Sequence, residues 1–265
     1  MKIIFYKYQG TGNDFIIIPE LHKIVEDLSA ETIRRLCHRH FGIGADGLMD
    51  VYDFSPEGSF SVRYYNSDGY KAEMCGNGAR CAARFAANYA GNTALWRFKV
   101  WEDWYAAIVK SDAVRVNWEK APILLELPAD LEADGHLKPV AFWNSGVPHL
   151  IIVVKNIEKT DVAGEGKFWR NHPYFLPAGT NVNFIEIQDS GEVRIRTFER
   201  GVEGETLSCG TGALAVAAEI ISQNPGKNKV TLLAAGGRLK AGREKEGTWW
   251  LEGPAELVFK GEMDL

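Results

Sequence analysis

Two stretches of this chain place a cysteine directly before a glycine-rich turn and a run of helix-forming residues. The first reads EMCGNGARCAARFA and begins at Glu73, and the second reads LSCGTGALAVAAEI and begins at Leu207. Both contain the order cysteine, glycine, polar residue, glycine, alanine. A thiol held in this way twice in one chain indicates proton transfer chemistry shared by two halves.

Each cysteine, Cys75 and Cys209, is expected just ahead of a helix N-terminus. Unpaired backbone N–H groups and the positive end of the helix dipole lie there, and both favour a thiolate. The neighbouring glycines let a ligand reach the backbone, whose N–H donors suit a carboxylate. A small buried thiol that only packs a tight loop is the simpler explanation of one such motif, but not of two at corresponding places. Each motif is therefore interpreted as a base beside an anion site.

Two such thiols that face each other across a domain cleft would hold one α-carbon from opposite sides. One thiolate would remove the α-proton while the other thiol donates a proton to the opposite face, which inverts the stereocentre. The carbanion needs preorganised donors around its carboxylate and exclusion of water, and two helix starts could provide the donors. No pattern in the chain indicates a pyridoxal site.

The elements that must position these motifs follow from the hydrophobic pattern of the first half. KIIFYKY and FIIIPE flank the loop QGTGND and predict two strands around a turn, and a helix follows over SAETIRRLCHRHF. GLMDVYDF and FSVRYYN predict a hairpin across SPEG. The first cysteine helix is expected from about Gly76 to Tyr89, closed by Gly91, and a meander of three strands follows it.

The second half repeats this order. NVNFIEIQ and EVRIRTFE predict a hairpin, and the second cysteine helix is expected from about Gly210 to Gln223. KVTLLAA, GRLKAG, GTWWLEG and AELVFKG then predict another meander. The repeated order indicates an internal duplication. Each cysteine helix is small and apolar around most of its circumference, so each should be buried inside a curved sheet.

We therefore expect an α+β fold of two pseudo-symmetric domains, each a curved, mostly antiparallel sheet around a central buried helix. The prolines of APILLELPAD place the boundary near Pro122. Residues 1–122 would carry Cys75, and residues 123–265 would carry Cys209. The last strand is left free to return to the first half.

Composition and charge narrow the classes of partner. The chain has 265 residues, of which 46% are hydrophobic, and this is enough for a core in each of two domains. A net charge of −5 gives no overall basic field, so we expect no nucleic acid partner. No apolar run has the length needed to cross a bilayer, and MKIIFYKYQG lacks the core of a signal peptide. We expect no membrane partner and a cytoplasmic location.

The cysteines do not form a disulfide framework, because the four occur at irregular spacing (Cys37, Cys75, Cys81 and Cys209) and a reducing compartment would keep them as thiols. A zinc site would have to involve CHRH, which begins at Cys37. Adjacent residues on a helix point in different directions and cannot easily share one ion. We expect instead a helix that ends with one buried thiol and two exposed histidines, and no metal site.

Eight blocks, spread over nearly the whole chain, occur in a fixed order: GTGNDF from Gly10, GIGADG from Gly42, YNSDG from Tyr65, MCGNGARC from Met74, GVPH from Gly146, GTNVNF from Gly179, ERG from Glu199 and ETLSCGTGA from Glu205. In these blocks and their order the chain resembles the diaminopimelate epimerase family. The resemblance implies interconversion of LL- and meso-diaminopimelate, on the route to lysine and peptidoglycan precursors, with no cofactor. A homodimer is a possible assembly.

The resemblance also assigns roles to residues of this chain. Cys75 and Cys209 match the two acid/base residues, and His149 matches a supporting site residue. Arg200 is suited to the distal carboxylate and Glu199 to an amino group. The full set matched to substrate binding is Asn13, Asn66, Gly76, Asn77, Asn181, Glu199, Arg200, Gly210 and Thr211. Taken singly, each has a structural explanation, because asparagines in such turns are turn formers and Glu199 and Arg200 could be a solvated pair.

Two positions depart from the family pattern. Val147 stands before the Pro-His pair, where the family usually carries an asparagine, so one polar contact near the distal end of the substrate is missing. ERGVEGET is one residue longer between ERG and ET than the commonest family spacing, which would reshape the loop before Cys209. Both departures bear on the ligand more than on the reaction type.

Three other functions remain open at the level of sequence. A racemase of another amino acid, as in the proline racemase relatives, also uses paired cysteines, but a small monocarboxylic substrate needs no second clamp of the kind that Glu199 and Arg200 form. An isomerase of the phenazine-biosynthesis type shares the fold but is not expected to keep both cysteines. A thiol redox switch, in which Cys75 and Cys209 close a reversible disulfide, explains the cysteines but not the carboxylate cradle.

Overall fold

The computed structural model describes residues 2–24, 28–73, 75–91, 94–118 and 120–264. The chain forms two compact units, of which unit 1 comprises Met1–Asn117 with Gly253–Leu265 and unit 2 comprises Trp118–Glu252. The division lies at Asn117, close to the boundary expected near Pro122, and the C-terminal segment belongs to unit 1, to which the last strand was left free to return. In the described part of the chain, no helix is both long and apolar enough to cross a membrane.

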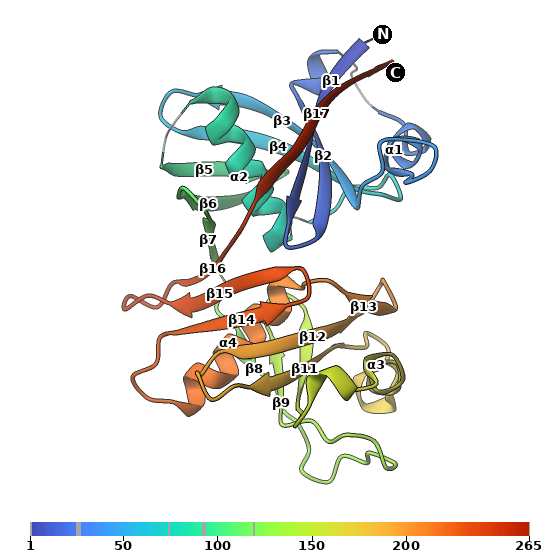
Figure 1. Ribbon diagram of the computed structural model, residues 1–265, viewed down its shortest axis with the longest axis vertical. Coiled ribbons are helices and arrows are strands. Elements are labelled where there is room, and N and C mark those ends of the chain that lie inside the picture. The colour runs from blue at the N-terminus through green and yellow to red at the C-terminus, as the bar shows by residue number, and fades with distance from the viewer. Residues whose placement is uncertain (1, 25–27, 74, 92–93, 119, 265) are drawn as a thin grey trace. The chain divides into compact units, whose positions relative to one another are not determined.

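The described residues of unit 1 form a mixed sheet and two α-helices (Figure 1). Neighbouring strands pair antiparallel except for β2 with β3 and β4 with β5, which are parallel. The elements in chain order are β1 (Lys2–Gly10), β2 (Asn13–Pro19), η1 (Leu21–Lys23), α1 (Ala30–Cys37), β3 (Gly47–Ser55), β4 (Ser59–Asn66), α2 (Gly76–Ala90), β5 (Leu95–Val100), β6 (Asp103–Val109) and β7 (Val114–Trp118).

The last strand, β17 (Glu256–Asp264), belongs to this sheet. It pairs antiparallel with β1, from Lys2 opposite Asp264 to Gln9 opposite Glu256, and the dark red and dark blue ribbons lie side by side in Figure 1. The first and last strands of the chain are therefore neighbours, which explains why the C-terminal segment joins unit 1.

Unit 2 has the same kind of mixed sheet. Its parallel pairs are β10 with β11 and β12 with β14, and its other strand pairs are antiparallel. The elements are β8 (Ile123–Leu124), β9 (Ala141–Asn144), β10 (Pro148–Val153), η2 (Ile157–Lys159), α3 (Val162–Arg170), η3 (Pro173–Phe175), β11 (Asn181–Ile187), β12 (Val193–Glu199), β13 (Gly204–Thr206), α4 (Gly210–Gln223), β14 (Lys229–Ala234), β15 (Gly237–Arg243) and β16 (Trp249–Gly253).

The duplication extends further than the sequence pattern predicts. In unit 1, an antiparallel hairpin and the helix α1 precede the parallel step to β3. In unit 2, the hairpin β9–β10 and the helix α3 precede the parallel step to β11. The sequence pattern predicts none of these three elements of unit 2, because two glycines weaken the helical signal of VAGEGKFWR and its neighbouring strands are short.

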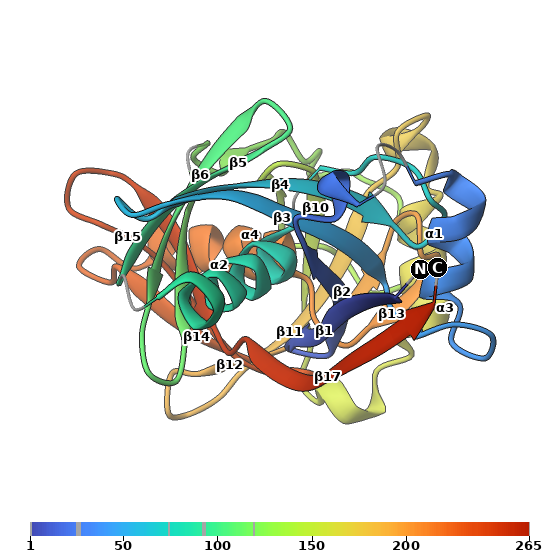
Figure 2. The ribbon, with the colours of Figure 1, turned by 90° about the horizontal axis from the view of Figure 1, so that it is seen from above.

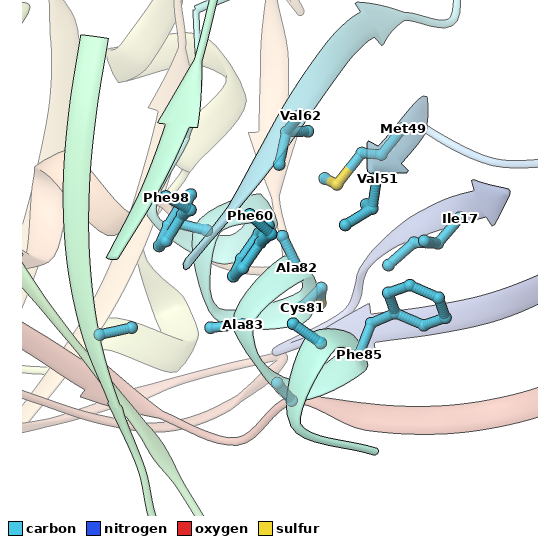
Figure 3. Close-up of a cluster of buried hydrophobic side chains, with 14 of the residues drawn as sticks. Ile17, Met49, Val51, Phe60, Val62, Cys81, Ala82, Ala83, Phe85 and Phe98 are labelled. Atoms are coloured by element: carbon cyan, nitrogen blue, oxygen red, sulfur yellow. The ribbon is translucent and has the colours of Figure 1, made fainter. Parts of the chain in front are cut away.

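Each cysteine helix is the centre of a hydrophobic core. Helix α2 lies against the strands of unit 1 in Figure 2. Its residues pack against apolar side chains from every strand between β1 and β7, among them Ile17, Met49, Phe60 and Phe98 (Figure 3). Those of α4 pack against the sheet of unit 2 in the same way. Both helices are buried along most of their length. This confirms the predicted α+β architecture and fixes the helix starts rigidly.

Helix α1 is shorter than predicted, because it ends at Cys37 rather than continuing to Phe41. His38 is extended, and the chain then folds back so that the N–H groups of Ile43 and Gly44 donate to the carbonyl of Leu36. This return fills the helix end so closely that a Cβ at Gly42 would lie 2.0 Å from the carbonyl oxygen of Arg35. The glycine therefore permits the helix to stop.

Candidate active site

The two motif cysteines occupy the same position on their helices. Cys75 is the N-cap of α2, and its sulfur accepts a hydrogen bond from the N–H of Gly78 at 3.3 Å. Cys209 is the N-cap of α4, which begins at Gly210 as predicted. Both sulfurs therefore lie beside the unpaired N–H groups of a helix start. Met74, which precedes Cys75 in its motif, lies outside the described residues.

In unit 1, Cys75 belongs to a group with two asparagines. The Cys75 sulfur lies 3.6 Å from Oδ1 of Asn13, and the amide nitrogen of Asn77 lies 3.5 Å from the same oxygen. Asn13 is held in this orientation because its own amide nitrogen donates to Asp46 at 2.6 Å. Gly76 and Asn77, the first residues of α2, are both buried. The structure thus brings together four of the predicted site residues of unit 1.

Asp46 is itself held by a charged network. The Arg39 guanidinium donates two hydrogen bonds to Asp14, at 3.0 and 2.9 Å, and a third to Asp46 at 2.8 Å. Lys7 forms a further ion pair with Asp14 at 2.8 Å. Burial opposes ionisation of Asp14, but the hydrogen bonds from Arg39 and Lys7 outweigh it and lower the pKa of the carboxyl group. This network fixes the loop that carries Asn13.

Asn66 is placed differently from the other predicted residues of unit 1. It lies at the end of β4, where its side chain is exposed and accepts a hydrogen bond from the hydroxyl of Tyr64 at 3.2 Å. Tyr64 packs in the core beside Cys75. Asn66 is therefore connected to the cysteine group through Tyr64.

In unit 2, Cys209 ends a chain of buried polar side chains. Its sulfur lies 3.4 Å from the hydroxyl of Thr211, and this hydroxyl lies 2.9 Å from Nε2 of His149. Nδ1 of His149 lies 3.1 Å from the amide nitrogen of Asn183. His149 and Asn183 are fully buried. The predicted supporting residue His149 is therefore connected to the predicted acid/base residue Cys209 by Thr211.

The neighbours of Asn183 determine where the protons of this chain lie. Its amide oxygen accepts from the Thr197 hydroxyl at 3.0 Å, and its amide nitrogen donates to the carbonyl of Leu150 at 3.1 Å. The remaining amide hydrogen points to Nδ1 of His149, which must accept it. His149 therefore carries its proton on Nε2 and donates it to Thr211, which leaves the threonine hydroxyl free to donate to Cys209.

Two further features support this arrangement. Burial lowers the pKa of His149 to about 3, so the imidazole is neutral, as the donor and acceptor pattern requires. Gly212 follows Thr211 on α4, and a Cβ there would lie 2.4 Å from Oδ1 of Asn183. The glycine lets Asn183 approach the helix start. The chain of hydrogen bonds is thus closely packed from Asn183 to Cys209.

The carboxylate of Glu199 is a second group that acts on the Cys209 thiol. Burial, and then the negative charge of Glu199, raise the pKa of Cys209 well above its usual range, although the hydrogen bond from Thr211 acts in the opposite direction. Glu199 also accepts a hydrogen bond from Thr206 at 2.8 Å. At Cys209, desolvation and the neighbouring carboxylate thus act against the thiolate that the helix start was expected to favour, and they raise the pKa of the thiol.

Asn181, the first residue of β11, and Arg200, which directly follows β12, are brought together by hydrogen bonds. The amide oxygen of Asn181 accepts from the backbone N–H of Arg200 at 2.9 Å, and its amide nitrogen donates to the carbonyl of Pro148 at 3.1 Å. Arg200 donates to the carbonyl of Ala178 at 3.0 Å and its side chain is only half-buried. Asn181 thus ties the ERG loop to the Pro148–His149 segment, next to the half-buried Val147.

The longer ERGVEGET loop is closed by its own glutamate. Glu203 has a positive φ of 56°, and its carboxylate accepts from the N–H of Gly201 at 3.0 Å. The same carboxylate pairs with Arg170 of α3 at 3.0 Å. The loop therefore forms a tight turn, after which β13 pairs with β12.

Among the described residues, no group of three or more histidine, cysteine, aspartate and glutamate side chains could hold a metal ion. Cys37 is buried at the end of α1, whereas His38 and His40 are exposed. CHRH is thus placed as its sequence predicts for a helix end.

A family model described as diaminopimelate epimerase matches residues 5–100 and 141–258 of this chain. The diaminopimelate epimerase of Aquifex aeolicus is 39% identical over 279 residues, which cover 98% of this chain and 97% of the relative. The chain belongs to the diaminopimelate epimerase family. The diaminopimelate epimerase of Archaeoglobus fulgidus is 38% identical over 284 residues, which cover 100% of this chain and 98% of the relative.

Solved structures confirm the fold of this diaminopimelate epimerase family member. A phenazine biosynthesis protein of the PhzF family from Enterococcus faecalis has a TM-score of 0.75 at 17% identity, and the match covers 100% of both chains. A hydroxyproline epimerase from Agrobacterium vitis has a TM-score of 0.67 at 14% identity, with 100% of this chain and 93% of that chain covered. At such identities the likeness shows the α+β fold alone.

Several site residues of this family member are not among those predicted from the sequence. Asn183 lies in the quoted block GTNVNF, and the two-residue period of a strand places it on the same face as Asn181. Arg80 lies in MCGNGARC, one helical turn after Gly76. Asp46 lies in GIGADG. Their positions in these blocks were the available signal, but their burial and partners depend on segments distant in sequence.

Proposed function

We propose that this member of the diaminopimelate epimerase family interconverts LL- and meso-diaminopimelate by direct proton transfer. Its relatives match over their full length, and the observation that carries the mechanism is the equivalent placement of Cys75 and Cys209 as N-caps of the two duplicated buried helices. Such equivalent positions suit two groups that perform the same proton transfer on opposite faces of one carbon.

The two cysteines have distinct roles at the start of one reaction direction. The thiolate of Cys75 takes the α-proton, and the electron pair of the broken C–H bond delocalises into the substrate carboxylate. The S–H bond of Cys209 then breaks as its proton forms the new C–H bond on the opposite face. Cys209 is suited to start as the thiol, because burial and Glu199 raise its pKa. The reverse reaction exchanges these roles.

The developing negative charge requires donors that are already in place. The backbone N–H groups of Gly76, Asn77, Gly210 and Thr211 begin helices α2 and α4, and we assign them to the carboxylate of the reacting centre. Donors fixed by a buried helix need no reorganisation during the reaction. The chain of Asn183, His149 and Thr211 holds the second helix start in the same way.

We assign the remaining predicted residues to the distal, unreactive end of the substrate. Arg200 is suited to its carboxylate and Glu199 to an amino group, with Asn13, Asn66 and Asn181 as further polar contacts. Half-buried Val147 offers no amide beside Pro148. We therefore expect the distal end to be held with one polar contact fewer than in relatives that carry asparagine there.

Incubation of the purified protein with LL-diaminopimelate, followed by chiral analysis of the product, tests the proposed function. Appearance of the meso isomer is expected, with no inversion of glutamate, proline or lysine, because these lack the distal amino acid group. Inversion of proline instead would identify a racemase of another amino acid.

A thiol redox switch predicts a different pattern. Alkylation of Cys75 and Cys209 should slow when diaminopimelate is present if both lie in a substrate site. Unchanged alkylation, together with no turnover, would favour a redox sensor over an epimerase.

We further propose a cytoplasmic location and a homodimer. A reducing compartment would keep the four cysteines as the free thiols that the mechanism needs. Strand β17 exposes the apolar side chains of Leu257, Val258 and Phe259, which a second copy of the chain could cover. Light scattering after size-exclusion chromatography would report the dimer, and a monomer over the whole concentration range would contradict it.

A further inference from the structure

Arg80 is a fully buried arginine of helix α2, one helical turn after Gly76, the first residue of the helix. In the described part of the chain, its side chain donates four hydrogen bonds, all to neutral groups. They reach the carbonyl of Gly76 at 3.2 Å, the hydroxyl of Thr11 at 3.1 Å, Oδ1 of Asn77 at 2.9 Å and the carbonyl of Pro254 at 3.3 Å. Within the described residues Arg80 forms no ion pair with a carboxylate. A buried cation of this kind is normally retained only where an anion accompanies it.

The titratable groups around Arg80 do not supply that anion. Cys81 and Tyr64 are both buried, and burial raises the pKa of each, so both are neutral near pH 7. Asp14 is already paired with Lys7 and Arg39. Burial lowers the pKa of Arg80 itself to about 10, which still leaves it charged, and the nearby sulfurs of Cys81 and Cys75 act in the opposite direction. Among the described groups whose charges act on Arg80, Cys75 is then the one left that can carry a negative charge.

We propose that Arg80 is the positioning residue of the first half-site, where its buried charge maintains Cys75 as a thiolate and its hydrogen bonds orient Asn77. The second half-site has the opposite sign, because Glu199 lies beside Cys209. The two equivalent helix starts thus differ in charge. This difference prepares one sulfur to accept a proton and the other to donate one.

The orientation of Asn77 follows from the same contacts. Arg80 donates to its amide oxygen at 2.9 Å, so the amide nitrogen must point away from the guanidinium. That nitrogen lies 3.5 Å from Oδ1 of Asn13, the oxygen that also accepts from the Cys75 thiol at 3.6 Å while this sulfur carries its proton. Arg80 therefore determines which atom of Asn77 faces Asn13, whose amide oxygen lies beside the Cys75 sulfur.

This inference rests on the proposed function but can be tested without turnover. In a Cys209→Ala background, the rate of Cys75 alkylation by iodoacetamide is measured against pH, with the modified peptide identified by mass spectrometry. Cys37 and Cys81 do not interfere, because both are buried. A midpoint below that of an unperturbed thiol, about pH 8.5, is expected. A midpoint at or above that value overturns the proposal whatever the epimerase activity.

Three substitutions separate charge from structure. Arg80→Met should lower the alkylation rate at pH 7 at least tenfold and raise the midpoint by at least one pH unit. Arg80→Lys should leave the midpoint within half a unit, because it retains the charge. In the protein that keeps Cys209, the same substitution should lower kcat, because Asn77 is no longer held. Arg84→Met is the matched control, since Arg84 is half-buried on the same helix and donates to Ala113 at 3.1 Å. Arg84→Met should change neither the midpoint of Cys75 alkylation nor kcat.

The outcomes distinguish the proposal from a purely structural role. A folded Arg80→Met variant with an unchanged midpoint would overturn it, as would an Arg80→Lys midpoint that moves as far as that of Arg80→Met. If Arg80→Met fails to fold, the midpoints of Cys75 alkylation in Arg80→Lys and in the Cys209→Ala protein still test the proposal. Failure of the unsubstituted protein, with both cysteines present, to epimerise diaminopimelate, with the alkylation results as expected, would contradict the proposed function alone.

Discussion

The amide nitrogen of Asn183 lies 3.1 Å from Nδ1 of His149, and this contact sets the direction of every hydrogen bond between His149 and Cys209. An amide nitrogen can only donate, so Nδ1 accepts and Nε2 carries the proton. Asn183 does not contact the sulfur, yet it decides that the Thr211 hydroxyl is free to donate to it.

Replacement of Asn183 by aspartate should reverse this pattern with little change in shape. A carboxylate beside Nδ1 favours a proton on that nitrogen, so Nε2 would accept from Thr211 and the hydrogen bond to Cys209 would be lost. We expect kcat to fall about tenfold or more, as for a lost hydrogen bond of about 1–3 kcal/mol. The ¹⁵N shifts of His149 would report the change of tautomer.

Asn156→Asp is the matched control, because Asn156 is an exposed asparagine that caps η2. It should leave kcat and the His149 shifts unchanged. Wild-type kcat in Asn183→Asp, with the tautomer changed, would show that the chain of hydrogen bonds does not serve the reaction.

Each of the substitutions Cys75→Ala and Cys209→Ala should abolish epimerisation and leave the fold intact. The lost group is an essential proton carrier, whereas alanine at a helix N-cap loses only a weak capping contact. Chiral analysis of the product would measure the activity, and thermal unfolding would show whether the fold is intact. Cys37→Ala provides a control at a buried thiol outside both motifs. Substantial turnover by either motif variant would exclude the two-thiol mechanism.

The substitution Arg200→Lys should lower catalytic efficiency markedly. Lysine retains the charge but cannot bind a carboxylate with two parallel hydrogen bonds, so we expect a loss on the order of 1.5–3 kcal/mol in transition-state binding. Steady-state kinetics with diaminopimelate would measure it. Arg194→Lys, at an exposed pair with Glu158, is the control. Equal kinetics of the two variants would mean that Arg200 does not hold the distal carboxylate.

The free energy of unfolding should decrease as the pH is lowered below about 6.5, partly because of His149. Its pKa is about 3 in the folded protein and about 6.5 in an unfolded chain. Below about pH 6.5 the unfolded chain binds a proton that folded His149 does not, so the free energy of unfolding falls by up to about 1.4 kcal/mol per pH unit. Above that pH the contribution is complete.

Denaturant unfolding at several pH values would measure this slope. The lowered pKa of Asp14 acts in the same direction, because its ionised form stabilises the fold and is lost as pH falls. The variant His149→Gln should therefore retain part of the slope, and His40→Gln, at an exposed histidine, should retain all of it. An unchanged slope in His149→Gln would contradict a buried neutral imidazole.

Local sequence is sufficient to place the elements whose physical cause is local. The order of cysteine, glycine and alanine predicts the starts of α2 and α4, and the structure has both at the predicted residues, Gly76 and Gly210. Capping and apolar periodicity act within a few residues, so a short window contains the whole physical cause. The duplication was visible for the same reason. The sequence pattern does not predict the helix over VAGEGKFWR, because its glycines weaken that local signal, although the folded chain forms a helix there.

Tertiary packing sets the properties that depend on burial and on distant partners. Arg80 meets Pro254 and Thr11, and Asn183 meets His149, across many residues of sequence. Desolvation by the surrounding core, together with Glu199, makes Cys209 a thiol although its helix start alone would favour a thiolate. A local pattern places a sulfur at a helix end, but its charge depends on the groups that the folded chain packs around it.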